Sequence, residues 1–214
     1  MIIRHQQIPI ACIDETVCLH EGTVYPNAIF LDLEHCIFKV PICIGVFGIC
    51  EYREGHLFTT QYMIENRQDS LDLLIIMRDY FATDLHGYMV TFAGGNDLSV
   101  IRYLFEKNKL EKEVLDHYIC VDLQKVYHAY TKENTGLKPL EKLFGIAREE
   151  EDLISGSALA RTFYKMMDDE QYSQRMPKEK IELILNYNLS DVINMFYIVT
   201  QWHRYVSRKE EETP

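Results

Sequence analysis

The chain has 214 residues, of which 47% are hydrophobic and 26% are charged, as in an ordinary globular protein. This composition excludes an intrinsically disordered chain, a collagen-like repeat and a small disulfide scaffold. The formal net charge is −11, and the first 97 residues carry −8 of it. Such a charge argues against a passive nucleic-acid coat, but not against an enzyme whose acidic site is filled by divalent cations.

The first half of the chain predicts a sheet, because short apolar runs alternate there with turn residues. Residues 28–33 and 42–50 are expected to form buried strands, and a polar turn then leads to a third strand at 57–63. Three consecutive strands with tight turns indicate an antiparallel meander. The other elements expected in this half are strands at residues 8–13, 88–92 and 118–121 and helices at 98–106 and at 71–82, the latter capped by Asp69 or Ser70.

From Leu123 onward, no segment of the sequence has the pattern typical of a β-strand. Helices are expected at residues 123–130, 137–144, 157–167 and 177 to about 205, with Pro177 at a first helical position. The sequence therefore predicts a mixed α/β fold with a five-stranded sheet flanked by helices and a helical C-terminal half. This order fits the ribonuclease H-like architecture, although periodicity alone does not choose it over other α/β folds. We expect a domain at residues 27–206, preceded by an extension at 1–26 and followed by a charged tail at 207–214.

The six cysteines form neither a C-x-x-C pair nor a zinc-ribbon spacing, and several lie in apolar runs. We therefore expect reduced thiols and a cytoplasmic protein. The N-terminal segment lacks the basic and apolar regions of a signal peptide. The longest apolar run, residues 40–50, is too short to span a bilayer and contains Pro41, so no membrane partner is expected.

Two acids lie at i and i+2 on the first buried strand. Because side chains alternate along a strand, Asp32 and Glu34 are expected on one face and Leu31 and Leu33 on the other. Two carboxylates that point the same way repel each other unless a cation lies between them. The alternative is a strand end that emerges into solvent, where acids are common.

A third acid, Asp97, follows a second apolar strand and the pair Gly94–Gly95, which permits a tight turn. It opens the next predicted helix. The alternative interpretation is that Asn96 or Asp97 is an ordinary N-cap.

A fourth acid lies in the long final helix. Tyr187 and Asp191 are four residues apart, so the hydroxyl and the carboxylate share a helix face and can converge. The residues around them form the apolar face of this helix, and an acid on that side needs a partner or a metal. The alternative is an exposed Asp191 beside a packed Tyr187.

Together these stretches resemble the D-x-E, x-D and Y-x-x-x-D motifs of the DEDD-type 3′–5′ exonucleases. A further likeness extends to the YprB-like ribonuclease H-like family. Residues 137–148 resemble its L-K-x-x-E-x-x-L-G-I-x-R stretch, and Ile154-Ser155-Gly156-Ser157 resembles its next segment. The resemblance covers the chain from about Ala28 to Trp202.

The resemblance implies a two-metal-ion hydrolysis of phosphodiester bonds at the ends of single-stranded DNA or RNA, without deciding between them. Carboxylates suit two Mg²⁺ or Mn²⁺ ions. Asp32 would bridge the two ions, Glu34, Asp97 and Asp191 would complete the sites, and Tyr187 would orient the attacking water. The more basic second half offers phosphate neighbours, each of which is alternatively an ordinary solvated charge: Lys138, Lys142, Arg148, Arg161 and Lys165.

The chain also departs from this family pattern. The family's D-x-E is often followed by T-T-G, whereas here His35 and Cys36 follow Glu34. In the second motif, Ala93 and Asn96 replace an Asn and a Phe that help to shape the substrate groove. The altered loop and the charge of −11 motivate a second hypothesis: a weakly active or inactive binding or scaffold protein that keeps the fold. Retention of all four acids favours the enzyme, because a like-charge cluster is costly without a metal.

Overall fold

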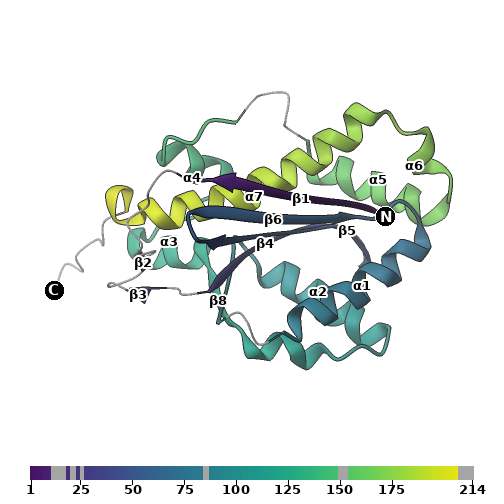
Figure 1. Ribbon diagram of the computed structural model, residues 1–214, viewed down its shortest axis with the longest axis horizontal. Helices are drawn as coiled ribbons and strands as arrows, with labels where there is room; N and C mark the ends of the chain where they lie inside the picture. The colour runs from purple at the N-terminus through teal and green to yellow at the C-terminus, as the bar shows by residue number, and fades with distance from the viewer. Residues whose placement is uncertain (11–17, 20–22, 25–26, 84–86, 149–153, 207–214) are drawn as a thin grey trace.

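A six-stranded mixed sheet forms the centre of the protein (Figure 1). The structure is a computed structural model that describes residues 1–10, 18–19, 23–24, 27–83, 87–148 and 154–206. The strand order is β1-β6-β5-β4-β7-β8, in which the first four strands are antiparallel and β4, β7 and β8 are parallel. The strands are β1 (Ile2–Pro9), β4 (Ala28–Phe38), β5 (Val40–Arg53), β6 (His56–Met63), β7 (Tyr88–Thr91) and β8 (Ile119–Asp122). A separate two-stranded ribbon joins β2 (Cys18–Leu19) and β3 (Thr23–Val24).

Helices cover both faces of the sheet. The long helix α7 crosses one face, and α1 and α2 lie on the opposite side (Figure 1). The helical elements are α1 (Arg67–Phe81), α2 (Gly95–Lys107), the 3-10 helix η1 (Lys112–His117), α3 (Leu123–Thr131), α4 (Leu137–Leu143), α5 (Gly156–Asp168), α6 (Tyr172–Arg175) and α7 (Lys178–Tyr205). The predicted ribonuclease H-like mixed α/β fold is thus confirmed.

The sheet has one strand more than the five predicted. Strand β1 pairs with β6 from Ile2↔Met63 to Pro9↔His56, so the sheet begins well before the predicted domain boundary at residue 27. Its side chains alternate between half-buried and exposed, as expected for an edge strand, and the polar run in its middle hides this pattern in the sequence. Of the predicted strand at residues 8–13, Ile8 and Pro9 lie in β1, whereas residues 11–13 lie outside the described residues.

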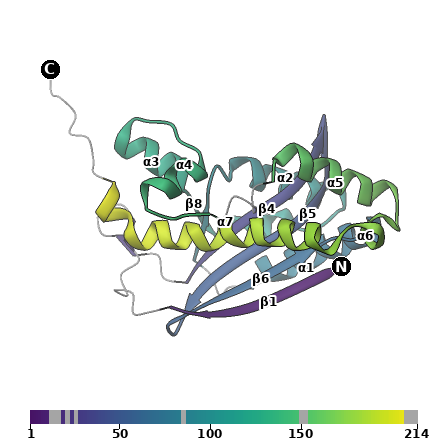
Figure 2. The same cartoon turned by 90° about the horizontal axis from the view of Figure 1, so that it is seen from above.

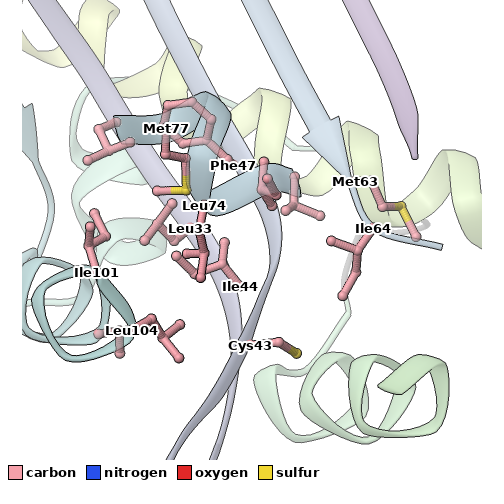
Figure 3. Close-up of a cluster of buried hydrophobic side chains, with 14 of the residues drawn as sticks. Leu33, Cys43, Ile44, Phe47, Met63, Ile64, Leu74, Met77, Ile101 and Leu104 are labelled. Atoms are coloured by element: carbon pink, nitrogen blue, oxygen red, sulfur yellow. The ribbon is translucent and has the colours of Figure 1, made fainter. Parts of the chain in front are cut away.

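Strand β4 positions the acids. Its neighbour β7 pairs with it only from Ala28 to Phe30, so the rest of β4 extends beyond β7. Leu31 and Leu33 lie in the core against α1 and α2, and Figure 3 shows Leu33 in this cluster. Phe30 packs instead on Phe196 of α7. The even-numbered positions of β4 therefore face α7, as the alternation predicted.

Two predicted helix starts need correction. Helix α1 begins at Arg67, because the Asn66 side chain accepts a hydrogen bond from the backbone N–H of Asp69 and caps the helix. Asp69 lies in the first turn, where it pairs with the N-terminal amine, so neither Asp69 nor Ser70 is the cap. Pro177 has an extended backbone and occupies the N-cap of α7 rather than its first helical position.

Cys36, Cys43, Cys50 and Cys120 are free thiols. Cys36, Cys43 and Cys50 are buried, and Cys120 is exposed. Burial raises the pKa of Cys43 to about 12, so this thiol stays protonated.

Among the residues that the structure describes, no helix has the length and apolar character needed to cross a membrane.

Candidate active site

The two acids of β4 lie on the sheet face that is covered by α7. Glu34 is 8% exposed, and Asp32 is partly buried. Strand β4 continues past Glu34 to Phe38, still paired with β5. The alternative of a strand end that emerges into solvent is therefore wrong.

Helix α7 brings a third acid to the same place. Asp191 is 6% exposed, so the alternative of a solvent-facing carboxylate is wrong as well. One carboxylate oxygen from each of Asp32, Glu34 and Asp191 lies within 4.8 Å of the other two. Residues that are about 160 positions apart in the chain thus form one acidic cluster, because α7 packs across the middle of the sheet.

Asp97 lies next to this cluster, in the first turn of α2. The N-cap of α2 is Gly94, so the interpretation of Asp97 or Asn96 as a cap is wrong. The charge of Asp97 contributes to the raised pKa values of Asp32 and Glu34, but Asp97 is not among the three acids whose carboxylate oxygens all lie within 4.8 Å of one another.

The two departures from the family pattern meet at Asp97. His35 Nε2 lies 3.3 Å from Asp97 Oδ1 and 3.2 Å from Asn96 Nδ2. A register shift between Glu34 and His35 accompanies this arrangement. The loop at residues 93–97 and the segment of β4 after Glu34 are therefore in contact through His35.

Burial and mutual repulsion raise the pKa values of the cluster. Burial, followed by the charges of Asp191 and Asp97, raises the pKa of Glu34 to about 8. Burial also raises the pKa of Asp191 to about 6, although Arg148 opposes this. The pKa of Asp32 lies well above its usual value because of burial and its three acidic neighbours. The metal-free cluster therefore disfavours its fully ionised form near neutral pH, and a bound cation would favour that form.

A buried ion-pair network supports Asp191, and the sequence did not reveal it. The Arg148 guanidinium donates through Nη2 to both Asp191 and Glu141, and through Nε to Glu141 at 2.7 Å. Glu141 is 1% exposed and also accepts a hydrogen bond of 3.0 Å from Asn194 of α7. Burial disfavours the charge on Arg148, but its hydrogen bonds with Glu141 and Asp191 outweigh this and hold its pKa above the usual range.

Tyr187 lies beside this network. The Lys138 ammonium is 4.9 Å from the centroid of the Tyr187 ring, and the Arg148 guanidinium is 5.4 Å from it. Burial raises the pKa of the Tyr187 hydroxyl, and the charges of Asp191 and Glu34 raise it further. The hydroxyl is therefore neutral at physiological pH, and it is both a donor and an acceptor.

The remaining basic candidates line two hollows. Lys138 and Lys142 line a cavity of about 500 Å³ beside Glu141 and Arg148. A groove of about 350 Å³ between the end of β4 and α5 is lined by Cys36, Ile37, Phe38, Ala160, Arg161, Tyr164 and Lys165. Helices α4 and α5 lie toward opposite ends of α7 (Figure 2). The predicted basic residues thus form two separate groups. One lies beside the middle of α7, where Lys138 is 4.9 Å from the centroid of the Tyr187 ring, and the other lies in the groove between β4 and α5.

The fold and the acidic cluster define a ribonuclease H-like protein. The model of one protein family, described as the RNase_H superfamily, matches residues 29–203. The chain therefore belongs to the RNase_H superfamily, whose members are generally nucleases. No curated protein matches the chain.

Proposed function

We propose that the protein is a metal-dependent 3′–5′ exonuclease that hydrolyses phosphodiester bonds at single-stranded DNA or RNA ends. The observation that carries this proposal is the convergence of Asp32, Glu34 and Asp191, with Asp97 beside them. A cluster of buried like charges is costly to a fold, and a cation site accounts for its presence.

The four acids have the ligand type that hard divalent cations prefer. Their ligand atoms are all carboxylate oxygens, which suit Mg²⁺ and Mn²⁺. In the proposal, Asp32, Glu34, Asp97 and Asp191 hold two such ions. The ions supply an activated water and stabilise the leaving oxygen.

Tyr187 has the properties that a water-orienting group requires. Its hydroxyl is neutral, and it lies near the carboxylates that influence its pKa. The cations of Lys138 and Arg148 contact its ring and restrict its position. In the proposal, the hydroxyl accepts and donates hydrogen bonds to fix the attacking water over the scissile phosphate.

The two basic groups are the proposed contacts for the substrate strand. Arg161 and Lys165 form no ion pair with any carboxylate in the part of the chain that the structure describes. Phe38 is 69% exposed and Tyr164 is 51% exposed in the same groove. Cations that flank exposed rings suit a single strand, because unpaired bases stack on aromatic side chains while lysine and arginine contact phosphates.

Arg148 has a different proposed role from the other basic residues. Its Nε and Nη2 groups are engaged by Glu141 and Asp191, whereas its buried Nη1 has no hydrogen-bond partner among the described residues. In the proposal, Arg148 therefore acts on Asp191, and it would reach a phosphate oxygen only if the site opened around Nη1.

A digestion panel tests the proposed activity. The substrates are 5′-labelled single- and double-stranded DNA and RNA, incubated with Mn²⁺ and with either the wild type or Asp32→Asn purified in parallel. We expect the wild type alone to shorten single strands stepwise from the 3′ end. Binding without cleavage would favour the scaffold hypothesis, and internal cuts at the earliest times would contradict the proposed polarity.

A further inference from the structure

We infer that Asn188 is a positioning residue that fixes the Asp32 carboxylate for metal binding through a chain of hydrogen bonds beginning at Gln61. This inference rests on the proposed function, because it takes Asp32 as a metal ligand. Neither Gln61 nor Asn188 belongs to the acidic cluster, and both are almost completely buried.

Asn188 makes direct contact with Asp32. Its Nδ2 group donates a hydrogen bond of 2.9 Å to Asp32 Oδ2 and one of 3.2 Å to the backbone oxygen of Asp32. A single side-chain amide thus binds the carboxylate and the main chain of the same residue. One carboxylate oxygen is held in place, and the other is left for a cation.

Gln61 determines which way the Asn188 amide points. Gln61 Nε2 donates hydrogen bonds of 2.8 Å to both Asn188 Oδ1 and the backbone oxygen of Leu185. If the Asn188 amide were reversed, its NH₂ group would face the Gln61 donor, and its oxygen would face the Asp32 carboxylate. The hydrogen-bond chain therefore permits one orientation, in which Asn188 donates to Asp32.

The sheet leaves a space for this amide. Asp32, Gly48 and Gln61 are paired in one row across β4, β5 and β6. A Cβ atom at position 48 would overlap Asn188 Oδ1, so the row accepts the amide only because its middle member is glycine. Asn188 enters from α7 above Gly48 and connects the two outer members of the row.

A neutral donor suits this position. Its hydrogen bond lowers the pKa of Asp32, against the increase that comes from burial and the neighbouring acids. It adds no positive charge that would compete with a metal ion for the carboxylate. Groups that orient metal ligands in this way typically contribute about 10- to 100-fold to metal affinity.

The test compares Asn188→Leu with Asn186→Leu in the full-length protein. Leu has the same branching and the same number of side-chain heavy atoms as Asn, although it is bulkier, and it has no donor. Asn186 lies on the same helix, and its Oδ1 accepts a hydrogen bond of 3.1 Å from Arg4 away from the acids. Free Mn²⁺ is measured by electron paramagnetic resonance during a titration, and metal-free melting is recorded for each variant. We expect Mn²⁺ affinity to fall about 10- to 100-fold for Asn188→Leu and by less than about twofold for the control.

A second variant keeps the inference testable if Asn188→Leu does not fold. Gln61→Met removes the donor that orients the amide but retains Asn188, and we expect a smaller loss of Mn²⁺ affinity in the same direction. A folded Asn188→Leu protein that melts at a lower temperature but binds Mn²⁺ as the wild type does would overturn the inference and leave the proposed function standing. A wild type that binds no Mn²⁺ would overturn both.

Discussion

Asp32 and Asp191 belong to the same acidic cluster but are supported in different ways. Asp32 is held by the neutral amide of Asn188. Asp191 is held by the charged guanidinium of Arg148, which Glu141 anchors from the other side. Asn188 is fully buried, the Arg148 side chain is 8% exposed, and both supports involve α7.

Because of this difference, the two sides of the acidic cluster depend on a bound cation to different extents. Arg148 supplies a permanent positive charge on the Asp191 side, so part of the cluster is neutralised without metal. No cation contacts Asp32 among the described residues, and its neighbours are acids and an amide. The Asp32 side is therefore the part of the site that depends most on a bound ion.

The largest expected effect comes from Asp32→Asn. We expect turnover to fall at least about 10⁴-fold, which corresponds to about 5 kcal/mol of transition-state stabilisation. Metal-free melting should not decrease, because Asn resembles the neutral form of Asp32 that burial and the neighbouring acids favour. The control is Asp191→Asn, which should lower both activity and metal-free stability, since it takes a partner from buried Arg148. Equal cleavage by folded Asp32→Asn and wild type would refute the metal assignment.

Arg148→Gln should have the next largest effect, on stability. It leaves the buried Glu141 carboxylate without its cation, and breaking a buried pair in this way costs about 3–5 kcal/mol. Arg102→Gln is the matched control, because it breaks an exposed pair with Asp116 and should cost less than about 1 kcal/mol. Chemical denaturation of the metal-free proteins measures both values. If the two variants lost similar amounts of unfolding free energy, the buried Arg148 network would contribute no more to stability than an exposed ion pair does.

Tyr187→Phe separates a role in catalysis from one in packing. The substitution removes one oxygen and retains the ring that Lys138 contacts. We expect kcat to fall at least tenfold at saturating Mn²⁺, because water-positioning groups contribute on the order of 10²–10⁴-fold. The KM for the nucleic acid and the Mn²⁺ affinity should change little. Full kcat in this variant would leave Tyr187 as a packing residue.

The smallest expected effect is a dependence of metal-free stability on pH. The pKa of Glu34 rises from its ordinary 4.5 to about 8 on folding, so between these values the folded state holds a proton that the unfolded state has lost. Stability should therefore decrease as the pH rises through this window. Metal binding needs the ionised carboxylate, so the increase in melting temperature caused by Mg²⁺ should be larger at pH 8 than at pH 6.

Glu34→Gln provides the control for this pH dependence. It retains the shape of the side chain but removes the titrating proton, so its metal-free stability should vary less between pH 6 and pH 8. A wild type whose Mg²⁺-induced change in melting temperature is the same at both pH values would contradict the assignment of these carboxylates as metal ligands.

The sequence predicted the parts of the site that depend on local periodicity. Alternation placed Asp32 and Glu34 on one face of a strand, and helical spacing placed Tyr187 and Asp191 on one face of a helix. Apolar runs likewise predicted most of the sheet. Strand β1 was missed because its half-buried edge position gives only a weak alternating pattern.

The supports of the acids could not be predicted in the same way. Glu141 and Arg148 meet Asp191 only because α4 packs on α7, and nothing in their local spacing indicates that contact. Gln61 and Asn188 are 127 residues apart. One signal was present: Gly48 interrupts an apolar strand, and an isolated glycine in a strand often marks a close approach by another group.

The central claim is that the acidic cluster holds divalent metal ions, and crystals grown with Mn²⁺ test it most directly. Anomalous scattering at the manganese absorption edge locates the ions independently of any activity. The account predicts peaks about 2.0–2.3 Å from carboxylate oxygens of Asp32, Glu34 and Asp191. Crystals soaked to saturation that show no peak at these three residues, or peaks only elsewhere on the protein, would contradict it.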